Sequence, residues 1–169
     1  MEKVFRLVCV GMVGLLLLSS GRAGAQDIEY SRATLRGLEG VRVLVEHMDQ
    51  DAQADGLTQQ QLQTAVELQL RKEGIPVLSM TQMPGTPYLY VTVTAHKDKG
   101  HSFYHYCFRV ELHQEVLLAR SPDIRAFATT WSLGGIAGIG SEALSGAVRA
   151  NILNYVDQFI HAYLSENPK

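Results

Sequence analysis

Two stretches of alternating apolar and polar side chains, joined by a short turn, most restrict the fold that this chain can adopt. Residues 88–96 and 104–113 each place apolar side chains at every second position. A period of two is typical of β-strands that bury one face. The intervening segment 97–100 is turn-like, which predicts an antiparallel hairpin that pairs His96 with Phe103. A shift of one residue would bury Arg109 and Glu111, so the pattern specifies the register.

Two further segments have the signals of helices. Thr58 followed three residues later by Gln61 forms a capping box for a helix at about 58–73. Ser141 is placed to cap a second helix at about 142–164, whose apolar residues recur at helical spacing. Segments rich in β-branched or aromatic residues predict strands at 41–45, 75–78 and 126–133. We interpret 26–36 as a loose lead-in, 49–56 as a polar loop and 134–140 as a flexible connection.

These elements predict an α+β fold with the order β-α-β-β-β-β-α. A single layer of two helices would cover one face of a mostly antiparallel sheet of about five strands. The opposite sheet face would be open to solvent or to a partner, as antiparallel sheets often are.

The first 25 residues have the regions of a cleavable secretory signal peptide in their usual order. Lys3 and Arg6 precede an apolar run from 7 to 18, and Ala23 and Ala25 supply the small residues at positions −3 and −1. The run is shorter than the roughly 20 residues that span a membrane. We therefore expect an exported protein, periplasmic or extracellular, with residues 26–169 as one domain and no transmembrane segment after cleavage.

Charge and cysteine content exclude several classes of partner. The full chain has a formal net charge of −2, and cleavage would remove more cations than acids. A mildly acidic domain without a basic stripe is not expected to bind nucleic acid or an anionic membrane surface. Cleavage would leave Cys107 as the only cysteine, which excludes an intrachain disulfide and favours a packed thiol. The oligomeric state is left open.

The polar face of the predicted hairpin is the main candidate for a binding surface. It gathers aromatic, imidazole and guanidinium side chains, and tyrosine and arginine are the residues favoured at binding hot spots. The candidate partner-binding residues are Tyr88, Tyr90, Phe103, His105, Arg109 and His113. An ordinary solvated sheet face, stabilised by aromatic cross-strand pairs, is the alternative interpretation.

The sequence patterns for metal, calcium, phosphate and catalytic sites are incomplete. His96 and His105 would share the outer face near the turn and are the candidate metal ligands, but their spacing is loose for zinc. The segment from Asp51 to Gly56 resembles the start of a calcium loop, yet Leu62 stands where that loop needs a bidentate glutamate. The glycine-rich segment 134–140 lacks the Lys-Ser/Thr of a phosphate-binding loop. No nucleophile elbow is present. We expect no cofactor and no enzymatic activity.

Segments across nearly the whole predicted domain resemble short exported bacterial proteins of unassigned activity. These segments are 37–41, 43–46, 66–71, 87–91, 128–132 and 156–164. The element order is also similar to small periplasmic α/β modules, such as the N-terminal domain of TolB and the auxiliary domains of envelope lipoproteins and transporters. The resemblance implies an envelope accessory module that binds another envelope protein or a hydrophobic ligand through a sheet face or sheet edge. A metal-binding protein and an enzyme without a recognisable motif are the alternatives.

Overall fold

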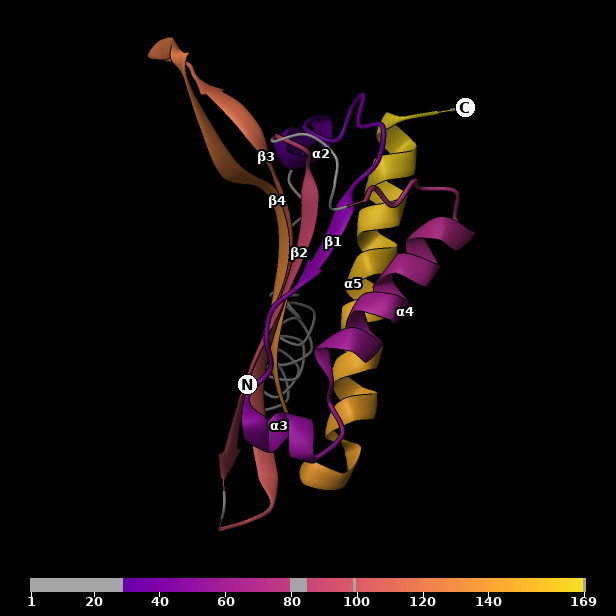
Figure 1. Cartoon of the computed structure of the whole chain (residues 1–169), viewed down its shortest axis with the longest axis vertical. Helices are drawn as coiled ribbons and strands as arrows, with labels where there is room; N and C mark the ends of the chain where they lie inside the picture. The colour runs from indigo at the N-terminus through magenta and orange to yellow at the C-terminus, as the bar shows by residue number, and fades with distance from the viewer. Residues whose placement is uncertain (1–28, 80–84, 99, 169) are drawn as a thin grey trace, which may run out of the picture.

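A computed structural model describes residues 29–79, 85–98 and 100–168 of the chain. The predicted signal peptide, 1–25, lies outside the described residues. The described residues form an α+β fold with an open four-stranded sheet, which confirms the predicted class (Figure 1). The strands are β1 (Arg42–Val45), β2 (Tyr88–Asp98), β3 (Phe103–Leu118) and β4 (Ser121–Gly140), in the spatial order β1-β2-β3-β4.

The predicted hairpin exists, with a register two residues away from the expected one. β2 and β3 are antiparallel, and His96 lies opposite His105 while Phe103 lies opposite Asp98. A shift by an even number of residues leaves every side chain on its predicted face. Accordingly, the apolar positions of both strands are buried, whereas His105 and Arg109 are exposed. Cys107 lies on the same face and is exposed, so the prediction of a packed thiol is wrong.

The sheet is mixed, and it has fewer strands than predicted among the described residues. β1 pairs with β2 in parallel, so the sheet combines one parallel pair with two antiparallel pairs. The predicted strand at 75–78 makes only an isolated bridge between Val77 and Val41. Pro76 has no N–H to donate to a longer ladder, and its carbonyl instead accepts from the Val41 amide at 3.1 Å.

β4 is much longer than the predicted strand 126–133. It begins at Ser121 after a tight turn and runs through the whole glycine-rich segment, which pairs residue by residue with β3 up to Gly140 opposite Phe103. The prediction of a flexible connection at 134–140 is therefore wrong. One reason is steric: a Cβ on Gly135 would lie 2.9 Å from the Tyr155 hydroxyl and 3.0 Å from Cζ of Phe108. Glycine there makes room for side chains that pack on the strand.

Two long helices cover one face of the sheet (Figure 1). α4 (Gln59–Lys72) begins as predicted, because the Thr58 hydroxyl accepts the Gln61 amide at 3.3 Å, and it ends before Gly74 at a positive φ of 80°. α5 (Leu144–Glu166) carries the predicted apolar stripe, which is buried. Ser141 does not cap it: the residue opens a short 3₁₀ turn, Ser141–Ala143, and its buried hydroxyl has no partner among the described residues.

Two short helices occupy segments predicted to be irregular. α2 (Glu29–Ala33) lies in the predicted lead-in, and the turn after it places Leu35 fully inside the core. α3 (Gln50–Ala54) lies in the predicted polar loop and buries Ala52. Neither segment has enough apolar positions to show helical periodicity, so the contacts with the rest of the fold decide their conformation.

The core lies between the sheet and the α4–α5 layer. Trp131 of β4 is 1% exposed and meets the Phe159 ring of α5 edge-on, at 5.2 Å between ring centroids. At one end β3 and β4 continue beyond the first residue of β2 as a two-stranded arm, formed by 114–118 and 121–128 (Figure 1). Arg125 and Glu115 form an ion pair on this arm at 2.6 Å.

Candidate functional site

The six predicted binding residues all belong to the sheet face opposite α4 and α5, which we call the outer face. The strand pairing places them at three levels along this face. Tyr88 and Tyr90 lie with His113 next to the arm, Arg109 lies near the middle, and Phe103 and His105 lie at the hairpin end. The structure thus brings three of the six residues together and leaves the other three apart from them.

The residues next to the arm form an aromatic cluster, which we define as Tyr88, Tyr90, His113 and Phe127. The Tyr88 ring stacks on His113 at 5.0 Å between centroids and on Phe127 at 6.0 Å. Tyr90 meets His113 edge-on at 5.5 Å. β2, β3 and β4 all contribute to the cluster, so its geometry is set by strand register. Aromatic pairs of this kind add roughly 0.5–1.5 kcal/mol each beyond their buried area.

Charged and polar groups surround the aromatic cluster. The Arg42 guanidinium of β1 lies over the Tyr88 ring, 5.5 Å from its centroid, which is a cation–π geometry. Burial raises the pKa of Tyr90, and the hydrogen-bonded carboxylate of Glu46 raises it further. The Thr129 hydroxyl lies 3.2 Å from Nε2 of His113. The cluster therefore presents flat apolar rings together with a cation and hydrogen-bonding groups.

Sequence reasoning missed Phe127 and Arg42. Simple alternation from the buried Trp131 would place Phe127 on the helix-covered face, but a bulge between Leu112 and His113 shifts the alternation of β4 and brings Phe127 to the outer face. Arg42 joins the cluster only because β1 pairs in parallel with β2, which puts it directly opposite Tyr88. Neither the bulge nor the parallel pairing has a clear sequence signal.

The hairpin end gathers histidines without forming a metal centre. His96 and His105 are cross-strand neighbours, and Nδ1 of His101 contacts the Asp98 carboxylate at 2.8 Å. This contact and the Gly100 amide lower the pKa of Asp98. His113 lies at the opposite end of the face. Within 29–79, 85–98 and 100–168, no three His, Cys, Asp or Glu side chains converge as metal ligands would.

The segment that resembles a calcium loop has a different role. Asp55 follows α3, and its carboxylate accepts hydrogen bonds from the Lys97 ammonium at 2.7 Å and the Tyr104 hydroxyl at 2.8 Å. These two donors lower the pKa of Asp55. The carboxylate thus ties the α3–α4 turn to the β2–β3 hairpin through its Oδ2 atom.

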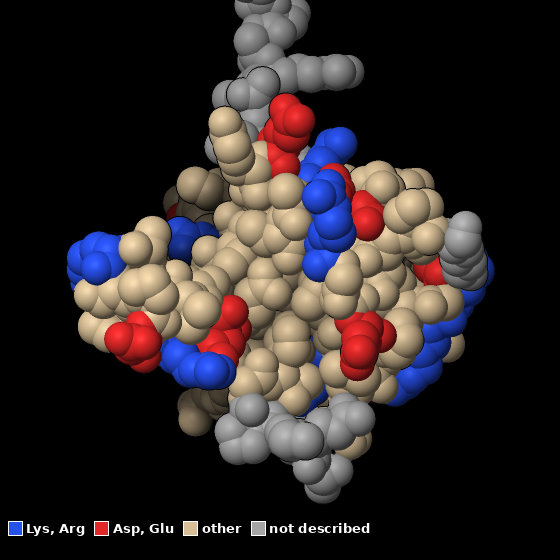
Figure 2. Space-filling view, turned by 90° about the horizontal axis from the view of Figure 1, so that it is seen from above, with Lys and Arg blue, Asp and Glu red and all other residues tan. Residues whose placement is uncertain are grey.

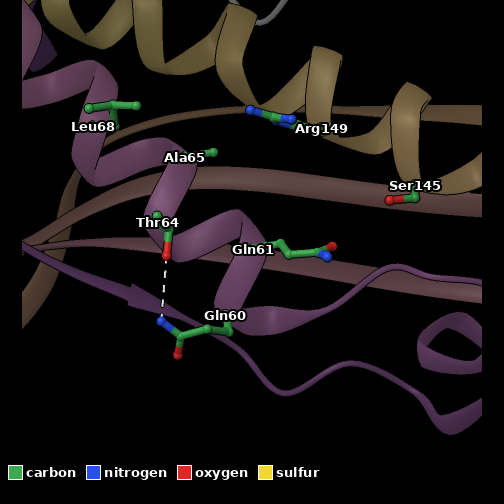
Figure 3. Close-up of a pocket in the computed structure, with 7 residues that line it drawn as sticks. All are labelled: Gln60, Gln61, Thr64, Ala65, Leu68, Ser145 and Arg149. Carbon is green, nitrogen blue, oxygen red and sulfur yellow. Dashed lines mark hydrogen bonds between the residues drawn. The ribbon is translucent and has the colours of Figure 1, made fainter.

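A groove of about 420 Å³ lies between α4 and α5, on the side away from the sheet (Figure 3). Gln61 of α4 points across it toward α5, which contributes Ser145 and Arg149, while Gln60 and Thr64 line it on the α4 side. The Gln60 amide donates to the Thr64 hydroxyl at 3.4 Å, and the Ser145 hydroxyl donates to the Gly56 carbonyl at 3.1 Å. Its polar groups thus partly satisfy one another, as expected for a solvated helix–helix groove.

Charge is mixed over the visible surface. Seen from the end that holds the arm, acidic and basic side chains alternate over the described residues without a continuous field of either sign (Figure 2). Some of the charged side chains form ion pairs, such as Arg125 with Glu115 on the arm and Arg36 with Glu166 at 2.8 Å. Electrostatic steering by one sign of charge is therefore not a feature of this end.

Comparisons with known proteins leave the resemblance to short exported bacterial proteins as a prediction. No protein-family model matches the chain, and no curated protein is similar to it. Among the helices that the structure describes, none is long and apolar enough to cross a membrane.

Proposed function

We propose that this protein is an exported, non-enzymatic binding module that receives another envelope protein on the outer face of its sheet. The observation that supports this most is the aromatic cluster with Arg42 above it, on a face that α4 and α5 leave uncovered. Tyrosine and arginine are enriched among residues that dominate binding energy. Rigid rings lose little conformational entropy on binding, which favours them as contact residues.

The side chains of the cluster define the chemistry of the partner. The stacked rings suit an aliphatic or aromatic side chain of another protein. Arg42, the Glu46 carboxylate and the Thr129 hydroxyl would pair with polar groups around that contact. Such a surface, apolar at its centre and polar at its rim, has the composition of a protein–protein contact. A hydrophobic small ligand would use the same rings, and the test below distinguishes it from a protein.

The test compares capture from envelope extract by immobilised wild-type protein and by two variants. Tyr88→Ala/Tyr90→Ala removes the centre of the cluster. Tyr30→Ala is the matched control, because Tyr30 is 86% exposed on α2, outside the sheet. We expect a partner that the wild type and the control capture equally and that the double variant loses. Circular dichroism should show that all three proteins are folded.

The purified partner then allows a measurement of affinity. Loss of a hot-spot tyrosine costs about 2 kcal/mol or more, which corresponds to roughly thirtyfold weaker binding. A partner captured equally by the double variant would refute the proposal. Fluorescence of 1-anilinonaphthalene-8-sulfonate that requires Tyr88 and Tyr90, without any captured protein, would instead assign the cluster to a hydrophobic ligand.

A further inference from the structure

β4 forms one edge of the sheet, and the last three quarters of the strand are uncharged. The strand order places β4 beside β3 only, and no other strand in the described part of the chain pairs with its second side. From Ala126 to Gly140 the strand contains no charged residue, no histidine and no proline. Natural edge strands are normally prevented from pairing with another chain by a lysine, by a proline or by their short length. From 132 to 140, beyond the bulge at Thr130, this edge has none of these protections.

We propose that the edge of β4 pairs antiparallel with the same edge of a second copy of this chain, about a two-fold axis at Ile136. The proposal is independent of the aromatic cluster and goes beyond the function proposed above. It would join two four-stranded sheets into one continuous sheet, with all the long helices on the same face.

The bulge limits which pairing is possible. Opposite residues in an antiparallel pair must point to the same sheet face. Beyond the bulge at Leu112/His113, β4 keeps a regular alternation from Trp131 to Gly140. A two-fold axis at Ile136 pairs 132–140 of one copy with 140–132 of the other. This overlap covers about 30 Å of edge at the usual rise of a strand.

In this register each side chain of one copy lies opposite a side chain of the second copy that it can pack against. On the outer face, Ile136, which is 86% exposed, meets Ile136 of the second copy. Gly134 then lies opposite Gly138, which brings two small residues together. On the helix side, Leu133 lies opposite Ile139, so the buried layer continues from one copy into the other. With no charges in the segment, no like-charge contact opposes this pairing.

The glycines give a further reason for a second copy. β4 has glycine at 134, 135, 138 and 140, and glycine weakens a strand that has only one neighbour. On this edge the Gly134 carbonyl already accepts from the Tyr155 hydroxyl at 3.2 Å, and a second strand would satisfy the other outward-pointing backbone N–H and C=O groups of 132–140. A second copy carries the same uncharged segment, whereas another partner would need a matching uncharged segment of its own.

The first experiment measures the mass of the purified protein by analytical ultracentrifugation over a range of concentrations. We expect wild type at twice the mass of one chain and Ile136→Lys at the mass of one chain. Leu44→Lys is the matched control, because Leu44 is an exposed aliphatic residue on β1, the opposite edge. It should stay at twice the mass. A monomeric wild type, or a dimer lost in Leu44→Lys but kept in Ile136→Lys, would overturn the proposal.

A second experiment tests the register by disulfide formation in a Cys107→Ser background, because Ile136 lies opposite Cys107 within one chain. Ile136→Cys would face its own copy at about 4.5–5.5 Å between Cα atoms, within reach of a disulfide. Ser132→Cys, also exposed, would lie about 27 Å from its copy. We expect a crosslinked dimer with Ile136→Cys only. Equal crosslinking of both variants would refute the register.

Discussion

Replacing two glycines of β4 by alanine tests whether 134–140 is an ordered strand or a flexible connection. Gly135 faces the core, where a Cβ would come within 2.9 Å of the Tyr155 hydroxyl and 3.0 Å of the Phe108 ring. Both groups are held: Tyr155 donates to the Gly134 carbonyl at 3.2 Å, and Phe108 is 5% exposed. A Cβ on Gly140 would have no heavy atom within 4 Å.

The two substitutions should therefore change stability in opposite directions. Gly135→Ala overpacks a filled region, which costs about 1–3 kcal/mol. Gly140 has φ −63° and ψ 148°, a conformation that alanine adopts without strain. Gly140→Ala should stabilise the protein by about 0.4–1 kcal/mol, because it lowers the entropy of the unfolded chain. The free energies of unfolding of the two variants should differ by roughly 1.4–4 kcal/mol.

Urea unfolding followed by circular dichroism and Trp131 fluorescence measures this difference. The experiment is best done in the Ile136→Lys background, where association of two copies would not contribute to the free energy of unfolding. Equal effects of the two alanines, or a stabilising Gly135→Ala, would refute the reasoning. That result would mean that the glycine-rich segment does not pack between β3 and α5.

Two further predictions concern other parts of the chain. Asp55→Asn should lower stability near neutral pH, and the difference from wild type should shrink as pH falls below 3.8, the ordinary pKa of an aspartate. The sign follows from the lowered pKa of Asp55: its stabilisation is present above the unfolded-state pKa and is lost as pH falls through the folded-state pKa. Separately, N-terminal sequencing of the protein from the envelope or medium should begin at Gln26, and an intact Met1 would contradict export by a cleaved signal peptide.

The elements that the sequence predicts well are those whose own residues carry the signal. The β2–β3 hairpin, α4 with its Thr58 cap, and the apolar stripe of α5 depend on periodicity and capping within each segment. Their faces are correct even though the hairpin register differs by two residues. These features are local, and local patterns are the part of a fold that a single sequence expresses most directly.

The features that sequence reasoning missed depend on tertiary contacts. The glycine-rich segment lacks β-propensity, and it becomes a strand because β3 offers a full-length partner on one side and α5 packs on its inner face. The aromatic cluster gains Phe127 through a bulge and Arg42 through a parallel pairing. The predicted residues Tyr88, Tyr90 and His113 do meet, whereas the fourth ring, Phe127, could not be predicted from the sequence.

The proposed pairing of β4 edges would also fix the distance between the aromatic clusters of two copies, and therefore whether one partner can contact both. Ile136 lies opposite Cys107, and His113 is six residues further along β3. The cluster is therefore about 20 Å from the two-fold axis along the strands, and the clusters of two copies are about 40 Å apart. No single side chain of a partner can touch both. Ile136→Lys should then leave the affinity of one cluster for a soluble partner unchanged, while it speeds dissociation from a surface coated with that partner, because only a dimer can hold two sites at once. A loss of affinity for the soluble partner would mean that edge and cluster act as one site.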